Sequence, residues 1–411
     1  MSVCSFWYSL FAAKIIVIFE RFLLYRMRKI SADILFPITS NPIENGVLVL
    51  NNNGTIIDVL QGAEADHLEE VEKFSGVLCP GFVNTHCHLE LSHLKGKIKQ
   101  GTSLPVFIEE LQQIRKTDEQ TLAEAISEAE NEMRQNGIVA VADIANGSSS
   151  FFQKSKQNLY YHTFMEVFGF NENQCHEIYE KAEALCKQYS CEVNKQVNVT
   201  PHAPYSVSLA LLQKIVNQNL IFSIHNQESE EENKMFIEGE GLLIKMLKKF
   251  GIKTEEWNIP QQHSLPYLLE HIKKQSNILL VHNTFTSAND IEAAMQSKAN
   301  IYWCFCPNAN LYIEKVLPDI PAFVMHNCKI TLGTDSLASN HHLSILEEIK
   351  TIKNYFPSVS YQEMLKWGTI NGAEFLGIQK RAGSLEKGKK PGVLLIDHAF
   401  TKVRKIADAI I

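Results

Sequence analysis

From Gly76 onward, short apolar runs alternate with longer stretches in which apolar residues recur at helical spacing. The apolar runs have the length and composition of buried strands, and we expect strands at 81–86, 138–144, 160–168, 197–202, 220–225, 278–283, 300–307 and 329–335. Segments such as 119–137 and 208–219 predict amphipathic helices between them. Strands that alternate with helices over about 250 residues predict a (β/α)8 barrel.

Both ends of this region have a different, β-rich pattern. Between Ser31 and Val71 short apolar pieces have strand character, and Asn53-Gly54 between two of them is typical of a hairpin turn. Residues 383–397 return to a turn followed by a strand. We therefore expect an α/β protein in which residues 80–379 form the barrel, while residues 27–79 and 380–411 together form a small β-sandwich domain beside it.

The first 26 residues are strongly apolar, which is typical of a signal peptide or a membrane anchor. No basic region precedes the apolar run and no small-residue cleavage site follows it. Lys14, Glu20 and Arg21 interrupt the run, which leaves too little apolar length for the roughly 20 residues of a spanning helix. We expect an atypical extension ahead of a natural start at Met27, with a surface-binding helix as the alternative and no membrane association unless that segment is a real anchor.

Composition and charge narrow the class of protein. The chain has 411 residues, of which 45% are hydrophobic and 21% charged, as in an ordinary globular protein. A net charge of -7 argues against a nucleic-acid partner, which would be met by basic clusters. The nine cysteines are scattered and contain no CxxC pair, so we expect a reducing, cytoplasmic setting and no cysteine-held zinc.

Metal-binding side chains fall at the predicted carboxyl ends of the strands, where barrels of this type carry their active sites. They are His86, His88, His202, His225, His282 and Asp335. In the sequence NTHCHLELSH, His86 and His88 share one face of the first strand because side chains alternate with period two, so they can grip one ion. His225 and Asp335 would supply the remaining ligands. Imidazole plus carboxylate suits one divalent ion, Zn2+ or Fe2+.

The same strand ends offer the groups for hydrolysis. A water molecule on such an ion has its pKa lowered to about 7, which would give a metal-bound hydroxide at neutral pH. Glu228, three residues after His225, could shuttle protons as general acid and base. His282 could orient the hydroxide or polarise the bond under attack, and Asp335 could accept the proton of the water while it binds the metal.

Each of these residues also has an ordinary structural explanation that involves no metal and no catalysis. A lone HxH is common, Glu228 could belong to a solvated helix face, and Asp335 could be a turn residue or a helix N-cap. Because the residues occur together at successive strand ends, such structural explanations are improbable for the whole set. Cys87 should face packing and His93 should be structural. Glu90 could contact substrate or orient a ligand, and Asn308 and Asn310 follow the seventh strand as candidates for substrate binding.

Several segments resemble the amidohydrolase superfamily, specifically its chlorohydrolase and aminohydrolase branch. They are PGFVNTHCH (80–88), HNQE (225–228), VHN (281–283), GTDSLASN (333–340) and GSLEKGKKPGVLLID (383–397). The resemblance implies a metal-bearing barrel beside a β-sandwich, with His86, His88, His225 and Asp335 as ligands and Glu228 and His282 as catalytic residues. No lysine ends the fourth strand, so the chain is similar to the mononuclear type.

The resemblance also implies an activity. Mononuclear members with this pattern are hydrolases of carbon–nitrogen bonds other than peptide bonds, and most are deaminases that release ammonia from a ring amidine. The runs HLELS, PHAPYSVS and CPNANLYI are most similar to aminodeoxyfutalosine deaminases of menaquinone biosynthesis. By the same resemblance, His202 contacts the sugar of a nucleoside-like small-molecule substrate. A homodimer is one option for the assembly.

Other activities remain open at this stage, because a few loop residues decide the substrate. Within the branch these are deamination of methylthioadenosine, S-adenosylhomocysteine or guanine, and hydrolysis of a ring chloride or of a cyclic amide. A scaffold that has lost its chemistry should lack a ligand or the catalytic glutamate, and here all are present. The zinc deaminase motif H-x-E with PCxxC is absent.

Overall fold

The computed structural model describes residues 27–255, 257–272, 276–297 and 299–409. All eight strands predicted for the barrel are present, as β6 (Phe82–Cys87), β7 (Ile138–Ala145), β8 (Tyr160–Val167), β9 (Val197–Pro201), β10 (Ile221–Asn226), β11 (Asn277–His282), β12 (Asn300–Phe305) and β13 (Ile330–Leu332). The last strand is shorter than predicted. The amides of Thr334 and Asp335 both donate to the carbonyl oxygen of His86, and Asp335 has a φ of 54°, so the chain turns before it reaches that residue.

The barrel strands form two parallel four-stranded sheets, β6-β7-β8-β9 and β10-β11-β12-β13. The two seams between the sheets are closed in part by side chains. At the β9–β10 seam the hydroxyl of Thr200 accepts from the amide of Ser223 at 2.9 Å. At the β13–β6 seam the hydroxyl of Thr85 donates to the carbonyl oxygen of Leu332 at 2.9 Å. The sheets therefore close into a barrel whose seams depend on threonine hydroxyls as well as on backbone hydrogen bonds.

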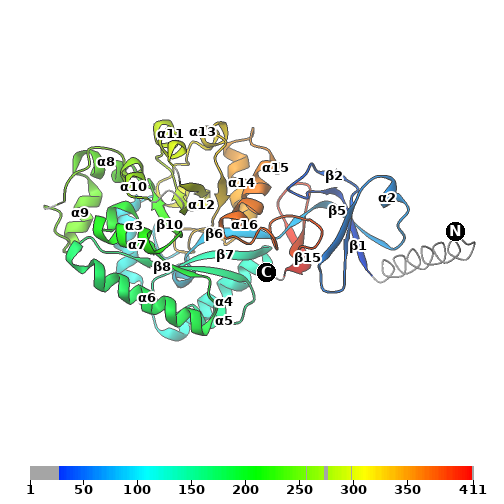
Figure 1. Ribbon diagram of the computed structural model, residues 1–411, viewed down its shortest axis with the longest axis horizontal. Helices are drawn as coiled ribbons and strands as arrows, with labels where there is room; N and C mark the ends of the chain where they lie inside the picture. The colour runs from blue at the N-terminus through cyan, green and yellow to red at the C-terminus, as the bar shows by residue number, and fades with distance from the viewer. Residues whose placement is uncertain (1–26, 256, 273–275, 298, 410–411) are drawn as a thin grey trace, which may run out of the picture.

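Helices surround the barrel (Figure 1). Apolar residues that recur every three or four positions bury one face of each longer helix; in α4 these include Ile126, Ala129 and Met133, which pack in the same core as Phe82 and Ile138. The helices and 3-10 turns of the described residues are η1 (Leu89–Leu94), α3 (Leu104–Ile114), α4 (Glu119–Gln135), α5 (Phe151–Ser155), η2 (Glu172–Gln174), α6 (Cys175–Glu192), η3 (Pro204–Ser206), α7 (Leu209–Gln218), α8 (Glu230–Glu238), α9 (Leu242–Lys249), α10 (Ser264–Glu270), α11 (Ala288–Gln296), α12 (Pro307–Ile313), α13 (Ile320–Met325), α14 (Ile345–Tyr355), α15 (Tyr361–Trp367) and α16 (Ile370–Phe375).

Strands from both ends of the described chain meet in one seven-stranded sheet beside the barrel, where the sequence predicted a β-sandwich (Figure 1). Its strands are β1 (Arg28–Leu35), β2 (Ile43–Glu44), β3 (Val47–Leu50), β4 (Ile56–Leu60), β5 (Val71–Pro80), β14 (Pro391–Ile396) and β15 (Val403–Ala409), with the short helix α2 (Ala63–Asp66) between β4 and β5. The strand order is β15-β14-β5-β1-β3-β4, and β2 pairs with β1. The predicted hairpin joins β3 to β4, and Gly54 there has the positive φ of 84° that favours glycine.

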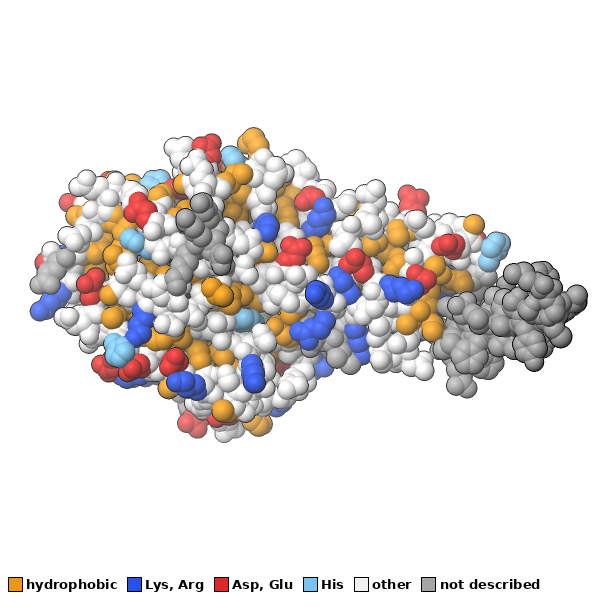
Figure 2. Space-filling model, in the orientation of Figure 1, with side chains coloured by type: hydrophobic (Ala, Val, Ile, Leu, Met, Phe, Trp, Pro, Cys, Tyr) orange, Lys and Arg blue, Asp and Glu red, His pale blue; other side chains and the backbone are white. Residues whose placement is uncertain are grey.

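On the face shown in Figure 2, acidic and basic side chains are interspersed with hydrophobic ones over both the barrel and the sheet. Within the described residues, no helix is long and apolar enough to cross a membrane. The predictions made for residues 1–26 lie outside the described residues.

Candidate active site

A cavity of about 1180 Å3 opens at the carboxyl end of the barrel strands. Its floor includes six of the predicted residues, His88, His202, His225, Glu228, His282 and Asp335. Its walls combine polar side chains with aromatic ones, which include Phe168, Phe170, Phe250, Trp257 and Tyr267. A large cavity with aromatic walls and converging polar groups is typical of a small-molecule site.

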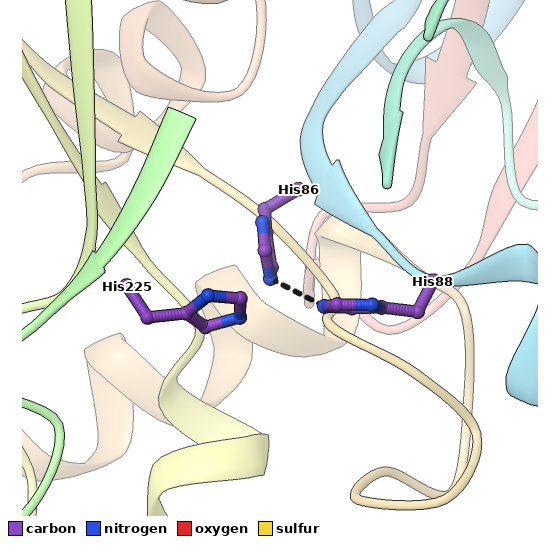
Figure 3. A group of neighbouring side chains, drawn as sticks. All are labelled: His86, His88 and His225. Carbon is purple, nitrogen blue, oxygen red and sulfur yellow. Dashed lines mark hydrogen bonds between the residues drawn. The ribbon is translucent and has the colours of Figure 1, made fainter. Parts of the chain in front are cut away.

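Three histidines converge at the carboxyl ends of the strands (Figure 3), and two of them, His88 and His225, line the cavity. His86 ends β6, His88 follows it, and His225 lies near the end of β10, across the barrel. The Nε2 atoms of His86 and His88 are 3.1 Å apart, and each of the three residues offers a ring nitrogen within 4.8 Å of the others. Nδ1 of His225 donates to the carbonyl oxygen of His202 at 2.8 Å, so its Nε2 keeps a free lone pair. Cys87 lies in the core outside the strands, as its alternate position predicts.

Asp335 completes the group from the loop after β13. Its Oδ1 lies 3.5 Å from the Nε2 atoms of both His86 and His88. The hydroxyl of Ser339 donates to Oδ2, which leaves Oδ1 directed at the two rings. Burial would raise the pKa of Asp335, but the His88 and His282 imidazoles and the Ser339 hydroxyl outweigh it, so the pKa lies below its ordinary value. The residue therefore presents a carboxylate.

These donors fit a divalent cation. Burial holds the pKa of both His86 and His88 well below the ordinary value, so the rings are neutral and can give lone pairs to an ion. The Nε2 atoms of these two neutral rings lie close to each other and to the Asp335 carboxylate, so one cation between them would be bound by all three groups. Nδ1 of His86 has no hydrogen-bond partner. Imidazole and carboxylate ligands suit zinc or ferrous iron.

Glu228 and His282, an acid and a base, lie beside the ligand group formed by His86, His88, His225 and Asp335. Burial, followed by the charge of Asp335, raises the pKa of Glu228 well above its ordinary value, which favours a protonated carboxyl group. Burial lowers the pKa of His282 to about 3, which keeps its ring neutral. Oε1 of Glu228 is 3.5 Å from Nε2 of His282. His282, the last residue of β11, has a φ of 72°, a strained conformation for a residue other than glycine.

His202 follows β9 and lines the cavity without joining the first ligand group. Its Nδ1 is 2.8 Å from the hydroxyl of Ser206, and its ring lies 4.6 Å from the ring of His225 and 4.5 Å from that of Phe168. The position agrees with a substrate contact.

The other three residues considered for substrate binding are not part of the cavity wall. The carboxylate of Glu90, which lies in η1, accepts from the amide of Asn146 and the hydroxyl of Ser149, so it holds the loop after β7. The amide groups of Asn308 donate to Glu348 on α14 at 2.9 and 3.0 Å. Asn310 is buried and donates to Thr284. All three side chains thus bind other groups of the protein, and a role toward substrate stays a prediction for each of them.

A buried ion pair that sequence reasoning missed supports the HxH segment. Lys154 on α5 lies 2.5 Å from Asp143 on β7, and both side chains are fully buried. The other oxygen of Asp143 accepts from the amide of Leu89, directly after His88. His93 is structural, as expected, because its Nε2 lies 2.9 Å from the carbonyl oxygen of Arg115. Asp143 gives a sequence signal, because it is a carboxylate near the end of the apolar strand IVAVADIA, whereas Lys154 stands in a mixed segment and gives none.

Glu166 at the end of β8 was also missed. Its side chain is 2% exposed, and its Oε1 lies 3.6 Å from Nδ1 of His225. Oε2 accepts from the side chain of Asn146, which in turn accepts from Arg115. In the sequence the residue stands inside the apolar strand YYHTFMEVF; a carboxylate near the end of a buried strand is the signal that could have found it.

This barrel, with its converging imidazoles and carboxylate, belongs to a known family of hydrolases. Residues 77–410 match the amidohydrolase family, and the chain is a member of it. The chain is 25% identical over 387 residues to a 5'-deoxyadenosine deaminase of Methanobrevibacter smithii, covering 89% of this chain and 82% of the relative. It is 26% identical over 382 residues to a 5-methylthioadenosine/S-adenosylhomocysteine deaminase of Bacillus cytotoxicus, covering 87% and 81%. The predicted hydrolase of carbon–nitrogen bonds is thereby confirmed.

Solved structures share the fold. The aminofutalosine deaminase of Helicobacter pylori in complex with methylthio-coformycin has a TM-score of 0.75 and 21% identity, covering 90% of this chain and 92% of that one. An adenosine deaminase of Xanthomonas campestris with bound zinc has a TM-score of 0.68 and 21% identity, covering 90% and 84%. The prediction of an amidohydrolase barrel with a separate β structure from both chain ends is confirmed.

Proposed function

We propose that the protein is a metal-dependent hydrolytic deaminase of an adenine-bearing nucleoside, with His86, His88, His225 and Asp335 as ligands of one divalent ion. The observation that carries the proposal is the convergence of these groups beside Glu228, a buried carboxyl group whose pKa is raised by its burial. The curated relatives, which are deaminases of adenine nucleosides, support the same reaction.

The chain's own residues can be given roles in this reaction. When bound, the ion would activate a water molecule for attack on the ring carbon that bears the amine. The carboxyl group of Glu228, whose pKa is raised by burial, would donate its proton to the neighbouring ring nitrogen. The neutral ring of His282, next to Glu228, would orient the attacking water. A carbon–oxygen bond forms and the carbon–nitrogen bond breaks. Of the two protons of the attacking water, one would pass to the amine, which leaves as ammonia, and the other would restore the carboxyl group of Glu228.

The cavity supports a substrate larger than a free base. Its volume of about 1180 Å3 lies above the usual range of about 300–1,000 Å3 for small-molecule sites. The rings of Phe170 and Trp257, 6.0 Å apart, and the ring of Phe168 offer surfaces for an apolar group attached to the sugar. Among adenine nucleosides we propose 6-amino-6-deoxyfutalosine, in a cytoplasmic menaquinone pathway, and the likeness to the H. pylori enzyme supports this choice.

The test is a panel of nucleosides. Purified protein loaded with Zn2+ or with Fe2+ is incubated with aminodeoxyfutalosine, 5'-deoxyadenosine, methylthioadenosine, S-adenosylhomocysteine, adenosine and guanosine, and ammonia is measured. We expect release from adenine nucleosides and the highest kcat/KM for aminodeoxyfutalosine. Failure to release ammonia from every adenine nucleoside with either metal would refute the proposed activity. A higher kcat/KM for another adenine nucleoside would refute only the choice of substrate.

A further inference from the structure

Glu166 presents a buried carboxylate oxygen that has no partner. Oε2 accepts a hydrogen bond of 3.0 Å from Nδ2 of Asn146. Oδ1 of Asn146 accepts from Arg115 at 2.5 Å, which fixes the amide so that its NH2 group faces Glu166. Oε1 has no hydrogen-bond partner, although the residue lines the cavity. Buried polar atoms of this kind are rare in folded proteins and need an explanation.

The nearest polar group does not satisfy Oε1. Nδ1 of His225 is 3.6 Å away, which is beyond hydrogen-bond distance. The proton on that nitrogen is already donated to the carbonyl oxygen of His202 at 2.8 Å. A group from outside the protein is therefore the natural partner. A hydroxyl group fits best, because it can donate to a carboxylate and can also accept from a protonated carboxyl group.

The order of the strands gives the direction in which such a substrate would lie. Glu166 is on β8 and His202 follows β9, whereas Glu228 and His282 follow β10 and β11. His225 on β10 lies between the two groups. A purine whose amine-bearing carbon lies beside Glu228 and His282 would direct its opposite edge, and the adjoining sugar, toward β8 and β9.

We propose that Glu166 binds the 2'-hydroxyl of the substrate's sugar and thereby makes the enzyme select ribonucleosides over 2'-deoxyribonucleosides. The proposal rests on the proposed nucleoside deaminase function. The 2'-hydroxyl is the sugar hydroxyl nearest to the base, so it is the one that the β8 side of the cavity can meet while the ring remains beside Glu228. His202, on the neighbouring strand, would border the same part of the sugar.

A second metal ion is the main rival explanation. Glu166, His202 and His225 each offer an atom within 4.8 Å of the others. However, Nδ1 of His225 is committed to the carbonyl oxygen of His202, and its Nε2 belongs to the first ligand group. Only two ligands would then remain for the second ion.

The experiment compares wild type with Glu166→Gln. The amide oxygen of the new side chain would keep the bond to Asn146, so an NH2 group would replace Oε1 and the charge-assisted hydrogen bond would be lost. Glu128→Gln is the control, because Glu128 is exposed on α4 and does not line the cavity. For each protein, kcat/KM is measured with adenosine, 2'-deoxyadenosine and 3'-deoxyadenosine, together with metal content per chain. Calorimetry with purine riboside and its 2'-deoxy form, which have no amine, measures binding without turnover.

We expect wild type and the control to prefer adenosine over 2'-deoxyadenosine by roughly 10- to 100-fold, as the loss of a hydrogen bond to a charged group implies. Glu166→Gln should lose this preference, keep its rate on 2'-deoxyadenosine and keep one ion. The proposal is overturned if wild type does not distinguish the two sugars in turnover or binding, or if the variant slows both substrates equally. Two ions in wild type and one in the variant would favour the metal explanation instead. Sugar-dependent binding without ammonia release would refute only the deaminase function.

Discussion

At the scale of single residues, Glu228 is the position at which a loss of turnover can best be separated from a loss of metal binding. The change Glu228→Gln keeps the size of the side chain but removes its acidic proton. Because Glu228 is not placed among the proposed ligands, we expect full metal content and a loss of turnover of roughly 100-fold or more, as for other general acids. Metal analysis and an ammonia assay on the same sample check both parts.

Glu230→Gln is the control for that variant, since Glu230 is an exposed residue at the start of α8. It should change neither metal content nor rate. Near-normal deamination by Glu228→Gln would contradict the assigned proton transfer. Loss of the metal would instead make Glu228 a ligand.

His86 tests the ligand group itself. His86→Ala removes one of the converging imidazoles, and we expect the bound metal to fall well below one ion per chain after dialysis. Elemental analysis gives the content, and a thermal shift on adding Zn2+ to metal-free protein gives an independent measure of binding. His342→Ala is the control, because that side chain is 61% exposed. Full occupancy in His86→Ala would show that the ion is held elsewhere.

The sequence predicted which residues converge at the strand ends but not the residues that support them, and the reason is physical. His86, His88, His225 and Asp335 were found because the ends of parallel strands converge at one end of a barrel. The direction of a side chain beyond the strand cannot be obtained in this way. Glu90 was thus considered for substrate, although it binds the loop after β7, while Glu166, Asn146 and Arg115 came together only through folding.

At the scale of elements, the turn after β13 depends on close packing at Gly333. A Cβ atom there would meet the Cβ of His86 at 2.7 Å and the sulfur of Cys304 at 2.9 Å. We expect Gly333→Ala to push β13 away from β6, to destabilise the fold by about 1–3 kcal/mol and to weaken metal binding. Urea unfolding and metal titration measure the two effects.

Gly147→Ala is the matched control, since a Cβ atom at Gly147 meets nothing within 4 Å. Its stability and metal affinity should be close to those of wild type. Equal behaviour of the two variants would mean that the contact at Gly333 can relax without cost.

The elements differ in how far they could be predicted. The strands of the barrel were all found, because continuous apolar runs bounded by polar residues are typical of strands that are buried on both faces. Boundaries were less accurate where a functional residue follows the strand, as at β13, because Asp335 adopts a positive φ that no hydrophobic pattern reveals. The edge strand β15 was not predicted, since its residues are mostly half-exposed and give a weak pattern.

At the scale of the whole molecule, one buried acid should make stability depend on pH. Burial raises the pKa of Glu232 on α8 from 4.5 to about 7. Between these two values the folded state keeps a proton that the unfolded state has lost. The contribution to the free energy of unfolding is therefore complete below about pH 4.5 and is lost as the pH rises to about 7, with a size of about 3 kcal/mol.

Glu232→Gln should remove this dependence. Urea unfolding of wild type and variant at pH 5 and pH 8 measures it, and the variant should gain about 3 kcal/mol relative to wild type between the two values. Glu230→Gln, at an exposed position of the same helix, should show no such gain. An unchanged difference between variant and wild type at the two pH values would contradict the raised pKa.

The two seams of the barrel give the proposed ion a mechanical consequence. His86 and His88 come from the sheet that ends at β9, whereas His225 and Asp335 come from the sheet that begins at β10. An ion bound by all four would cross-link the two halves of the barrel at the seams that rely on Thr85 and Thr200. Removing it with a chelator should speed hydrogen exchange at the seam amides of His225 and Thr334 while leaving the β7–β8 ladder protected. If the chelator changes hydrogen exchange equally at the seams and in the β7–β8 ladder, the two halves hold together without the ion.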